Sequence, residues 1–129
     1  MKNNKGFTLV ELMAVIVVLA IIISIAIPSA ISISHKIKVK MYNTKVDMIL
    51  SSAKIYGQDN PAIVNADETC SSSVSVDELI NNGYIKKDDT KNGIVLNTVD
   101  NTSLNDKEIC IYKKNNRIHA KIHGTWPSY

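Results

Sequence analysis

The fold of this chain is decided by its amino-terminal stretch, MKNNKGFTLVELMAVIVVLAIIISIAIPSAISIS (Met1–Ser34). No charged residue occurs from Leu12 to Ser34. As a helix this uncharged run would be about 35 Å long, enough to cross the roughly 30 Å hydrocarbon core of a bilayer. A secretory signal peptide would have a shorter apolar region followed by a small-residue cleavage site. The residues from Ser32 to Lys38 contain no convincing site of that kind, so we expect the run to be retained as a membrane span.

The remainder of the chain limits the classes of function. The whole chain has 129 residues and a formal net charge of +3, too small an excess to indicate a nucleic-acid-binding protein. Residues 57–129 are the only stretch able to form a globular head, near the lower size limit for a stable core. No nucleophile-and-base signature, phosphate loop or cofactor fingerprint occurs, so we expect no enzyme and no cofactor. His119 and His123 share a face with Lys121 but lack a third ligand, so we expect no metal site.

A short basic leader precedes the span. It contains Lys2 and Lys5 and continues as Gly6-Phe7-Thr8-Leu9-Val10-Glu11. This arrangement resembles the class III signal of type IV pilins and of the pseudopilins of type II secretion and competence systems, over residues 1 to about 30. The resemblance implies that a membrane prepilin peptidase cleaves after Gly6 on the cytoplasmic side. It also implies that the new amino terminus at Phe7 is N-methylated and that the apolar run is kept.

Two residues of the span carry further expectations. A carboxylate within a membrane span is costly unless it is paired, so Glu11 needs a cation. The amine of Phe7 lies four residues away on the same helical face. The resemblance implies that Glu11 pairs instead with the Phe7 amine of a neighbouring subunit in a filament; a carboxylate that reaches the lipid headgroups is the alternative. Pro28 removes one backbone hydrogen bond and kinks the helix, at a position where many pilin helices bend.

Beyond the span an apolar stripe recurs at spacings of three and four residues: Val39, Tyr42, Val46, Ile49, Ala53 and Tyr56. The stripe predicts that the helix continues from Phe7 to about Tyr56, with Gly57 at its end. The intervening basic residues are interpreted as a solvated helix end rather than as a nucleic-acid or lipid-headgroup patch: His35, Lys36, Lys38 and Lys40. Three lysines follow the span and two precede it, so charge counting weakly favours a cytoplasmic head. The leader motif favours the opposite orientation, and we give it more weight than one lysine.

The head is predicted to contain one short helix and a small antiparallel sheet. Ser75-Val76-Asp77-Glu78 is a capping box and Gly83 suits a helix end, which predicts a helix over residues 76–82. A strand is predicted over Gly93–Val99. With Asn115-Asn116 as a two-residue turn, the last hairpin pairs Lys114 with Arg117, Tyr112 with His119 and Cys110 with Lys121. Its apolar face is then expected to pack on the helical stripe: Ile109, Ile111, Ile118, Ala120 and Ile122.

This register places Cys110 on the outer face of the hairpin, where the long polar loop of residues 57–75 could cross. A Cys70–Cys110 disulfide would close a loop of 41 residues and contribute about 4 kcal/mol in the chain-entropy model. Two free or buried thiols are the alternative. For Trp126 and Tyr129, packing on the head is the default and contact with a neighbouring molecule the alternative.

Together these features predict an α+β, pilin-like fold: a long amino-terminal helix whose second half packs on a small antiparallel sheet. The expected segments are a leader (1–6), a membrane-spanning or filament-core half-helix (7–34), an amphipathic half-helix (35–56) and a head (57–129).

The function implied by the resemblance is that of a structural subunit of a type IV pilus-like filament, used in adhesion, motility or as a surface appendage. Alternatives are a pseudopilin of a type II secretion or competence DNA-uptake system, and a single-span anchored binding module that never polymerises. Expected partners are the prepilin peptidase, other pilin subunits and membrane lipid; DNA or a host-surface ligand has no support in the sequence. The precursor is expected in the cytoplasmic membrane with its head outside, and the mature subunit in an extracellular filament.

Overall fold

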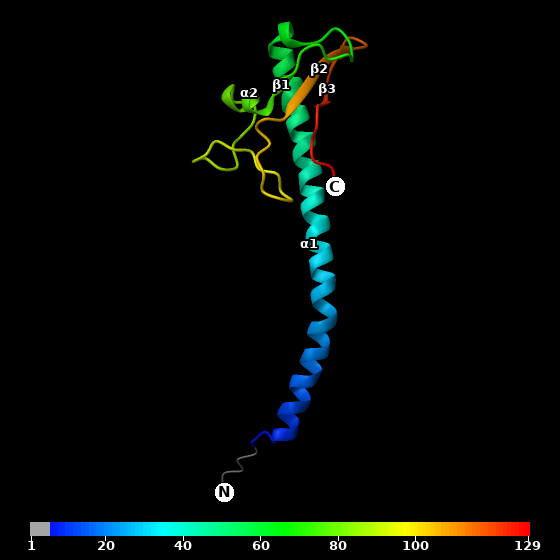
Figure 1. The fold of residues 1–129 in the computed structure, drawn as a ribbon, viewed down its shortest axis with the longest axis vertical. Coiled ribbons are helices and arrows are strands. Elements are labelled where there is room, and N and C mark those ends of the chain that lie inside the picture. The colour runs from blue at the N-terminus through cyan, green and yellow to red at the C-terminus, as the bar shows by residue number, and fades with distance from the viewer. Residues whose placement is uncertain (1–5) are drawn as a thin grey trace. The chain divides into compact units, whose positions relative to one another are not determined.

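The computed structural model describes residues 6–129, and its fold is α+β, as predicted (Figure 1). A 51-residue helix, α1, runs from Leu9 to Asp59. After the 3-10 turn η1 (Pro61–Ile63) come β1 (Val74–Ser75), α2 (Val76–Asn81), β2 (Glu108–Lys114) and β3 (Arg117–His123). The strands form one antiparallel sheet in the order β1-β2-β3. The chain divides into two compact units, with the boundary between Ile37 and Lys38.

The amino-terminal part of α1 is apolar and uncovered. Its large apolar side chains, from Leu12 to Ile33, are each more than half exposed. By length and composition α1 is able to cross a membrane, as the uncharged run predicts. Pro28 lies inside the helix.

The carboxyl-terminal part of α1 carries the predicted stripe into the core of the head. Tyr42, Ile49, Ala53 and Tyr56 are buried there, together with Ile109 and Ile111 of β2. Leu79 of α2, Val95 and Leu104 complete the same cluster. One face of the carboxyl-terminal part of α1 therefore forms one side of the hydrophobic core of the head.

The prediction that Gly57 ends the helix was wrong, because α1 continues to Asp59. Gly57 is buried, and a Cβ atom built on it would lie 2.6 Å from Cγ2 of Ile111. The glycine is thus present for close approach between the helix and β2, and not for a left-handed cap. The helix ends instead ahead of Asn60-Pro61, where Asn60 leaves helical geometry with φ −127° and ψ 72°.

The predicted hairpin register is confirmed: Cys110 pairs with Lys121, Tyr112 with His119, and Lys114 with Arg117. The turn residues Asn115 and Asn116 have φ of 51° and 61°, as a two-residue turn matched to the strand twist requires. One expected inward residue differs. Ile122 is 47% exposed, because it lies near the end of the edge strand β3.

The predicted helix of the head is confirmed within one residue. Ser75 caps α2 by accepting a hydrogen bond from the Glu78 N–H at 3.1 Å. Asn82 is the carboxyl cap and Gly83 follows with φ of 80°. The Glu78 carboxylate accepts a hydrogen bond from the Tyr56 hydroxyl at 2.9 Å, which ties α2 to α1.

The predicted strand over Gly93–Val99 was wrong. Only isolated bridges join Asp89 to Ile94 and Leu96 to Ser103. Side chains take the place of a neighbouring strand, since the Val95 N–H donates to Asn105 Oδ1 and the Leu96 N–H to Asp88 Oδ2, each at 2.8 Å. β2 pairs with β3 along one edge and with the two-residue β1 along the other, where Val74 lies opposite Ile109.

Candidate processing and assembly site

The start of α1 is held by a reciprocal capping box that our sequence analysis overlooked. The Thr8 N–H donates to Glu11 Oε2 at 3.1 Å, and the Glu11 N–H donates to Thr8 Oγ1 at 3.3 Å. The signal was the Thr8-x-x-Glu11 spacing, the same pattern that predicted the cap of α2. Because Thr8 is the cap, regular helix begins at Leu9 and not at Phe7.

This cap leaves the expected cleavage point outside the helix. Gly6, Phe7 and Thr8 are non-helical and exposed, and the Phe7 side chain is 92% exposed. A Cβ atom built on Gly6 meets no atom within 4 Å. A protease needs an accessible, extended peptide, so this local geometry suits cleavage between Gly6 and Phe7. The leader lysines Lys2 and Lys5 lie outside the described residues.

Glu11 is exposed on the first turn of α1. In the uncleaved chain its carboxylate is engaged by the Thr8 N–H. The amine of Phe7 exists only after cleavage, so the pairing of Glu11 with that amine stays a prediction. A carboxylate at the amino-terminal end of a helix also interacts favourably with the unpaired N–H groups there.

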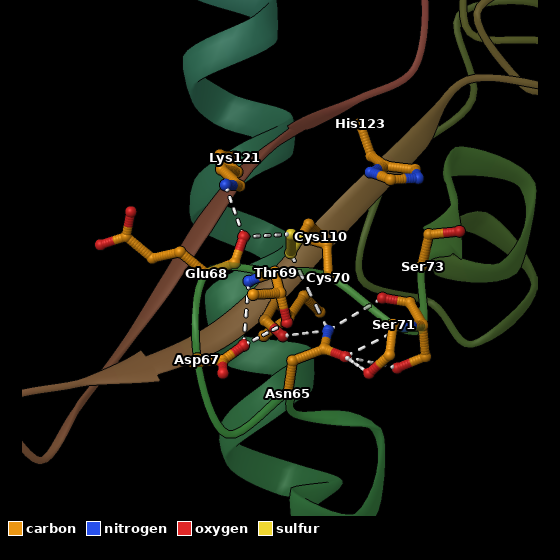
Figure 2. Close-up of a disulfide and its surroundings, with 12 residues drawn as sticks. Asn65, Asp67, Glu68, Thr69, Cys70, Ser71, Ser73, Cys110, Lys121 and His123 are labelled. Carbon is orange, nitrogen blue, oxygen red and sulfur yellow. Dashed lines mark hydrogen bonds between the residues drawn. A yellow bond between two sulfur atoms is a disulfide. The ribbon is translucent and has the colours of Figure 1, made fainter.

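The head contains the predicted disulfide between Cys70 and Cys110, with a Cα–Cα distance of 5.6 Å (Figure 2). The loop that carries Cys70 also pairs with the backbone of β2. The Asn65 N–H donates to the Ile111 carbonyl at 2.8 Å, and the Lys113 N–H donates to the Asn65 carbonyl at 2.9 Å. The bridge holds the start of the loop along the edge of β2 that faces away from β3. The disulfide holds Cys70 over the outer face of the hairpin.

Asn65 organises the loop through its side chain and was missed by sequence reasoning. It is 6% exposed. Its Nδ2 donates to the carbonyls of Ser72 and Ile111 at 2.8 and 2.9 Å. Its Oδ1 accepts from the Ser72 N–H at 3.0 Å and from the Ser71 hydroxyl at 3.1 Å. The Asn65 amide thus forms hydrogen bonds with Ser71 and Ser72 of the loop and with Ile111 of β2, which lie far apart in the sequence.

Two lysines on the outer face of the hairpin, Lys114 and Lys121, also bind the loop that carries Cys70. The Lys121 ammonium donates to the Glu68 carbonyl at 2.8 Å, and Lys114 forms an ion pair with the Glu68 carboxylate. The hydrogen bond from Lys114 lowers the pKa of Glu68 below its ordinary value. His119 stacks on Tyr112 with ring centroids 5.5 Å apart. Within residues 6–129, no three His, Cys, Asp or Glu side chains group as a metal site.

The carboxyl-terminal residues pack on the head. Trp126 is buried and its indole N–H donates to the Glu108 carbonyl at 2.9 Å. The Tyr129 hydroxyl accepts from Asn97 Nδ2 at 2.7 Å and donates to Asp100 Oδ2 at 3.0 Å. The Tyr129 ring meets the Tyr42 ring edge to face, with centroids 5.3 Å apart. Trp126 and Tyr129 thus both contact the head, which was the default expectation from the sequence.

Comparison with known proteins bears on the amino-terminal region. No curated protein matches the chain, and no solved structure does so either. Residues 1–27 match a family model described as the prokaryotic N-terminal methylation motif. That motif is the class III signal peptide of type IV pilins. The chain therefore carries a prepilin-type signal followed by an apolar helix, which fits a type IV pilin-like precursor anchored in a membrane.

Proposed function

We propose that this chain is a structural subunit of a type IV pilus-like filament. It is inserted in the membrane as a prepilin, cleaved after Gly6 by a prepilin peptidase, N-methylated at Phe7 and polymerised through the apolar half of α1. The observation that carries the proposal is the match of residues 1–27 to the methylation motif. The motif belongs to structural proteins, which agrees with a role that is not enzymatic.

The uncovered apolar surface of α1 supports polymerisation. Outside a bilayer, a helix with exposed apolar side chains from Leu12 to Ile33 must be covered by other protein. Other copies of the same helix, or those of partner pilins, supply such a cover in a filament core. Lipid covers this surface before assembly, with the head on the outer side of the membrane.

Glu11 supports a filament subunit over a mere anchor. A single-span anchored binding module needs no carboxylate at the edge of its span, where burial without a cation is costly. In the proposed filament the Glu11 carboxylate leaves the Thr8 N–H and pairs with the Phe7 amine of a neighbouring subunit. Pro28, inside the same packed segment, gives the helix a point at which it can bend during assembly.

The direct test of this function is processing. In cells that contain the peptidase, the intact mass of the protein should correspond to loss of residues 1–6 and gain of one methyl group. Gly6→Val should block maturation because a β-branched side chain hinders the extended backbone at the cleavage point. Gly6→Ala, a matched small residue, should still be cleaved. Retention of Met1 in the native sequence, or cleavage after Ser34, contradicts the proposal.

Electron microscopy of filaments sheared from the cell surface and labelled for this protein separates the related functions. Labelled long surface filaments indicate a pilus, whereas processing without surface filaments indicates a pseudopilus of a secretion or DNA-uptake system.

A further inference from the structure

A cavity of about 440 Å³ lies in the head, lined by residues of α1 and of the segment that follows α2. This volume falls within the range of about 300–1,000 Å³ that is usual for small-molecule sites. Every residue that lines it belongs to the head unit, Lys38–Tyr129. The cavity is therefore formed by a single copy of the chain and does not require assembly.

The walls of the cavity are largely apolar. α1 contributes Met48 and Ile49, and the segment after α2 contributes Ile85 and Val95. Tyr84 also lines the cavity, but its hydroxyl donates to a carboxylate oxygen of the last residue of α1 at 2.7 Å, so that hydroxyl is already engaged. An apolar group placed in the cavity would be shielded from water, which favours its binding.

Two lysines that line the cavity carry charges that the head does not neutralise. Lys86 and Lys87 are exposed, and neither forms an ion pair with any residue from 6 to 129. Lys87 lies against Gly93, since a Cβ atom built on Gly93 would be 3.6 Å from the Lys87 Nζ. The missing side chain of this glycine leaves room for the ammonium group beside the loop.

The carboxylates nearest to these lysines in the sequence are engaged elsewhere. Asp88 binds the Lys45 ammonium and accepts a hydrogen bond from the Leu96 N–H at 2.8 Å. Asp89 accepts a hydrogen bond from Asn92 Nδ2 at 2.7 Å. Lys45 and Asp88 both line the cavity and offset each other's charge. The lining therefore keeps two positive charges without a counter-charge.

We propose that this cavity is a binding site for a small organic anion, a carboxylate with a compact apolar body. The apolar body occupies the space beside Met48 and Ile85, and the carboxylate accepts hydrogen bonds from the ammonium groups of Lys86 and Lys87. Such charge-assisted hydrogen bonds are stronger than neutral ones. A neutral ligand gains less from the lysines, and a cationic ligand is repelled by them. The site goes beyond the proposed filament function and does not depend on it.

The methyl signals of methionine test the site by nuclear magnetic resonance. The full chain, with isotope-labelled methionine methyl groups, is held in uncharged detergent micelles and titrated with phenylpropionate as the probe. We expect a saturable shift of the Met48 signal. Met41 does not line the cavity and Met13 lies in the apolar run, so their signals report non-specific binding and entry of the probe into the micelle. Neither of these two signals should show a saturable shift.

The charge of the ligand and the role of the lysines are tested separately. Phenylpropionamide, a matched neutral compound, should bind about tenfold more weakly than phenylpropionate. The double variant Lys86→Gln/Lys87→Gln should weaken binding of phenylpropionate about tenfold and leave binding of phenylpropionamide unchanged. Lys91→Gln, at an exposed lysine of the same loop that does not line the cavity, is the control and should bind both compounds as the native chain does. All variants should keep the thermal midpoint of the head.

Several results would overturn the site. They are an unshifted Met48 signal, parallel shifts of all three methionines, equal affinity for the acid and the amide, and native affinity of the double lysine variant for phenylpropionate. None of these measurements involves cleavage after Gly6 or incorporation into filaments. Failure of the site is therefore distinguishable from failure of the proposed function.

Discussion

At the scale of single residues, Gly57 shows how a tertiary contact can make glycine more favourable than alanine inside a helix. In an exposed helix interior, glycine is less stable than alanine by about 1 kcal/mol. Here the absence of a side chain lets α1 approach β2, and an added Cβ would lie 2.6 Å from Ile111 Cγ2 and 3.3 Å from Val64 Cγ2. Both contacting atoms are methyl groups on short, branched side chains, which cannot move aside as the end of a long flexible side chain could.

We therefore predict that Gly57→Ala destabilises the head, lowering the free energy of unfolding by about 1–3 kcal/mol through overpacking. Thermal unfolding followed by circular dichroism, on the full chain in detergent, measures this change. Gln58→Ala, at the neighbouring exposed position, is the matched control and should have little effect. A midpoint raised by Gly57→Ala would mean that helix propensity outweighs the contact with Ile111.

A second residue-scale feature is the ion pair between α1 and the loop that follows α2. The Lys45 ammonium contacts Asp88 Oδ2 at 2.5 Å and donates to the Leu96 carbonyl at 2.8 Å. Partial burial raises the pKa of Asp88, but the hydrogen bonds from Lys45 and from the Leu96 N–H outweigh burial, so the pKa is lowered from its ordinary value of 3.8. The ionised carboxylate therefore stabilises the folded loop.

The sign of the pH dependence follows from this lowered pKa. The stabilisation is fully present above the ordinary pKa of 3.8 and is lost as the pH falls through the lower pKa of the folded state. We predict that Asp88→Asn lowers the thermal midpoint at neutral pH and makes it less sensitive to acidification than that of the native chain. The comparison is a series of melts from neutral to strongly acidic buffer. Parallel curves for the two proteins would show that Asp88 carries no such linkage.

At the scale of elements, the hairpin and the loop that crosses it form one cross-linked assembly. Its contacts are the Cys70–Cys110 disulfide, the Asn65 amide and the two lysine contacts to Glu68. The loop contributes few apolar side chains to the core, where Ile63 and Val64 are only partly buried. The disulfide thus adds stability that the small hydrophobic core of the head does not provide by burial alone.

We predict that reduction of the disulfide lowers the thermal midpoint of the head by about 15–30 °C. Reduction removes about 4 kcal/mol of stabilisation, and each kcal/mol shifts the midpoint of a domain of this size by about 4–8 °C. The measurement compares melts of the full chain with and without reductant. The double variant Cys70→Ser/Cys110→Ser is the control, and its midpoint should be low and insensitive to reductant. An equal midpoint for oxidised and reduced native protein would show that Asn65 and the lysine contacts suffice.

At the scale of the whole molecule, Glu11 links the two states that we propose for the chain. In the precursor it completes the cap of α1 with Thr8, and in the proposed filament it would pair with the amine of another subunit. Glutamine also serves at this position of a capping box. Glu11→Gln therefore removes the charge and keeps the cap.

We predict that Glu11→Gln leaves membrane insertion and cleavage intact but lowers incorporation into filaments by about tenfold or more, because the partner amine loses its counter-charge. Immunoblots of membrane and sheared-filament fractions measure both steps. Asp47→Asn, which neutralises an exposed carboxylate on the head portion of α1, should change neither. Wild-type levels of Glu11→Gln subunits in filaments would refute the pairing.

Features that depend on local pattern could be read from the sequence. The uncharged run predicted the spanning portion of α1, the Asn115-Asn116 turn set the register of β2 and β3, and Ser75 predicted the start of α2. That register in turn indicated where the loop bearing Cys70 could reach Cys110. Each of these depends on the period of a helix or strand, or on the backbone preference of a few neighbouring residues.

Features that depend on residues distant in the sequence could be found only in the folded chain. Gly57 reads locally as a helix end, yet its partner Ile111 lies 54 positions away in the sequence. Residues 93–99 read as a strand, but side chains of Asn105 and Asp88 take backbone N–H groups that a ladder would use. Asn65 has no local signal, because its role is to satisfy polar groups on two separate segments. Such contacts form only when folding brings the segments together, so no local period or spacing encodes them.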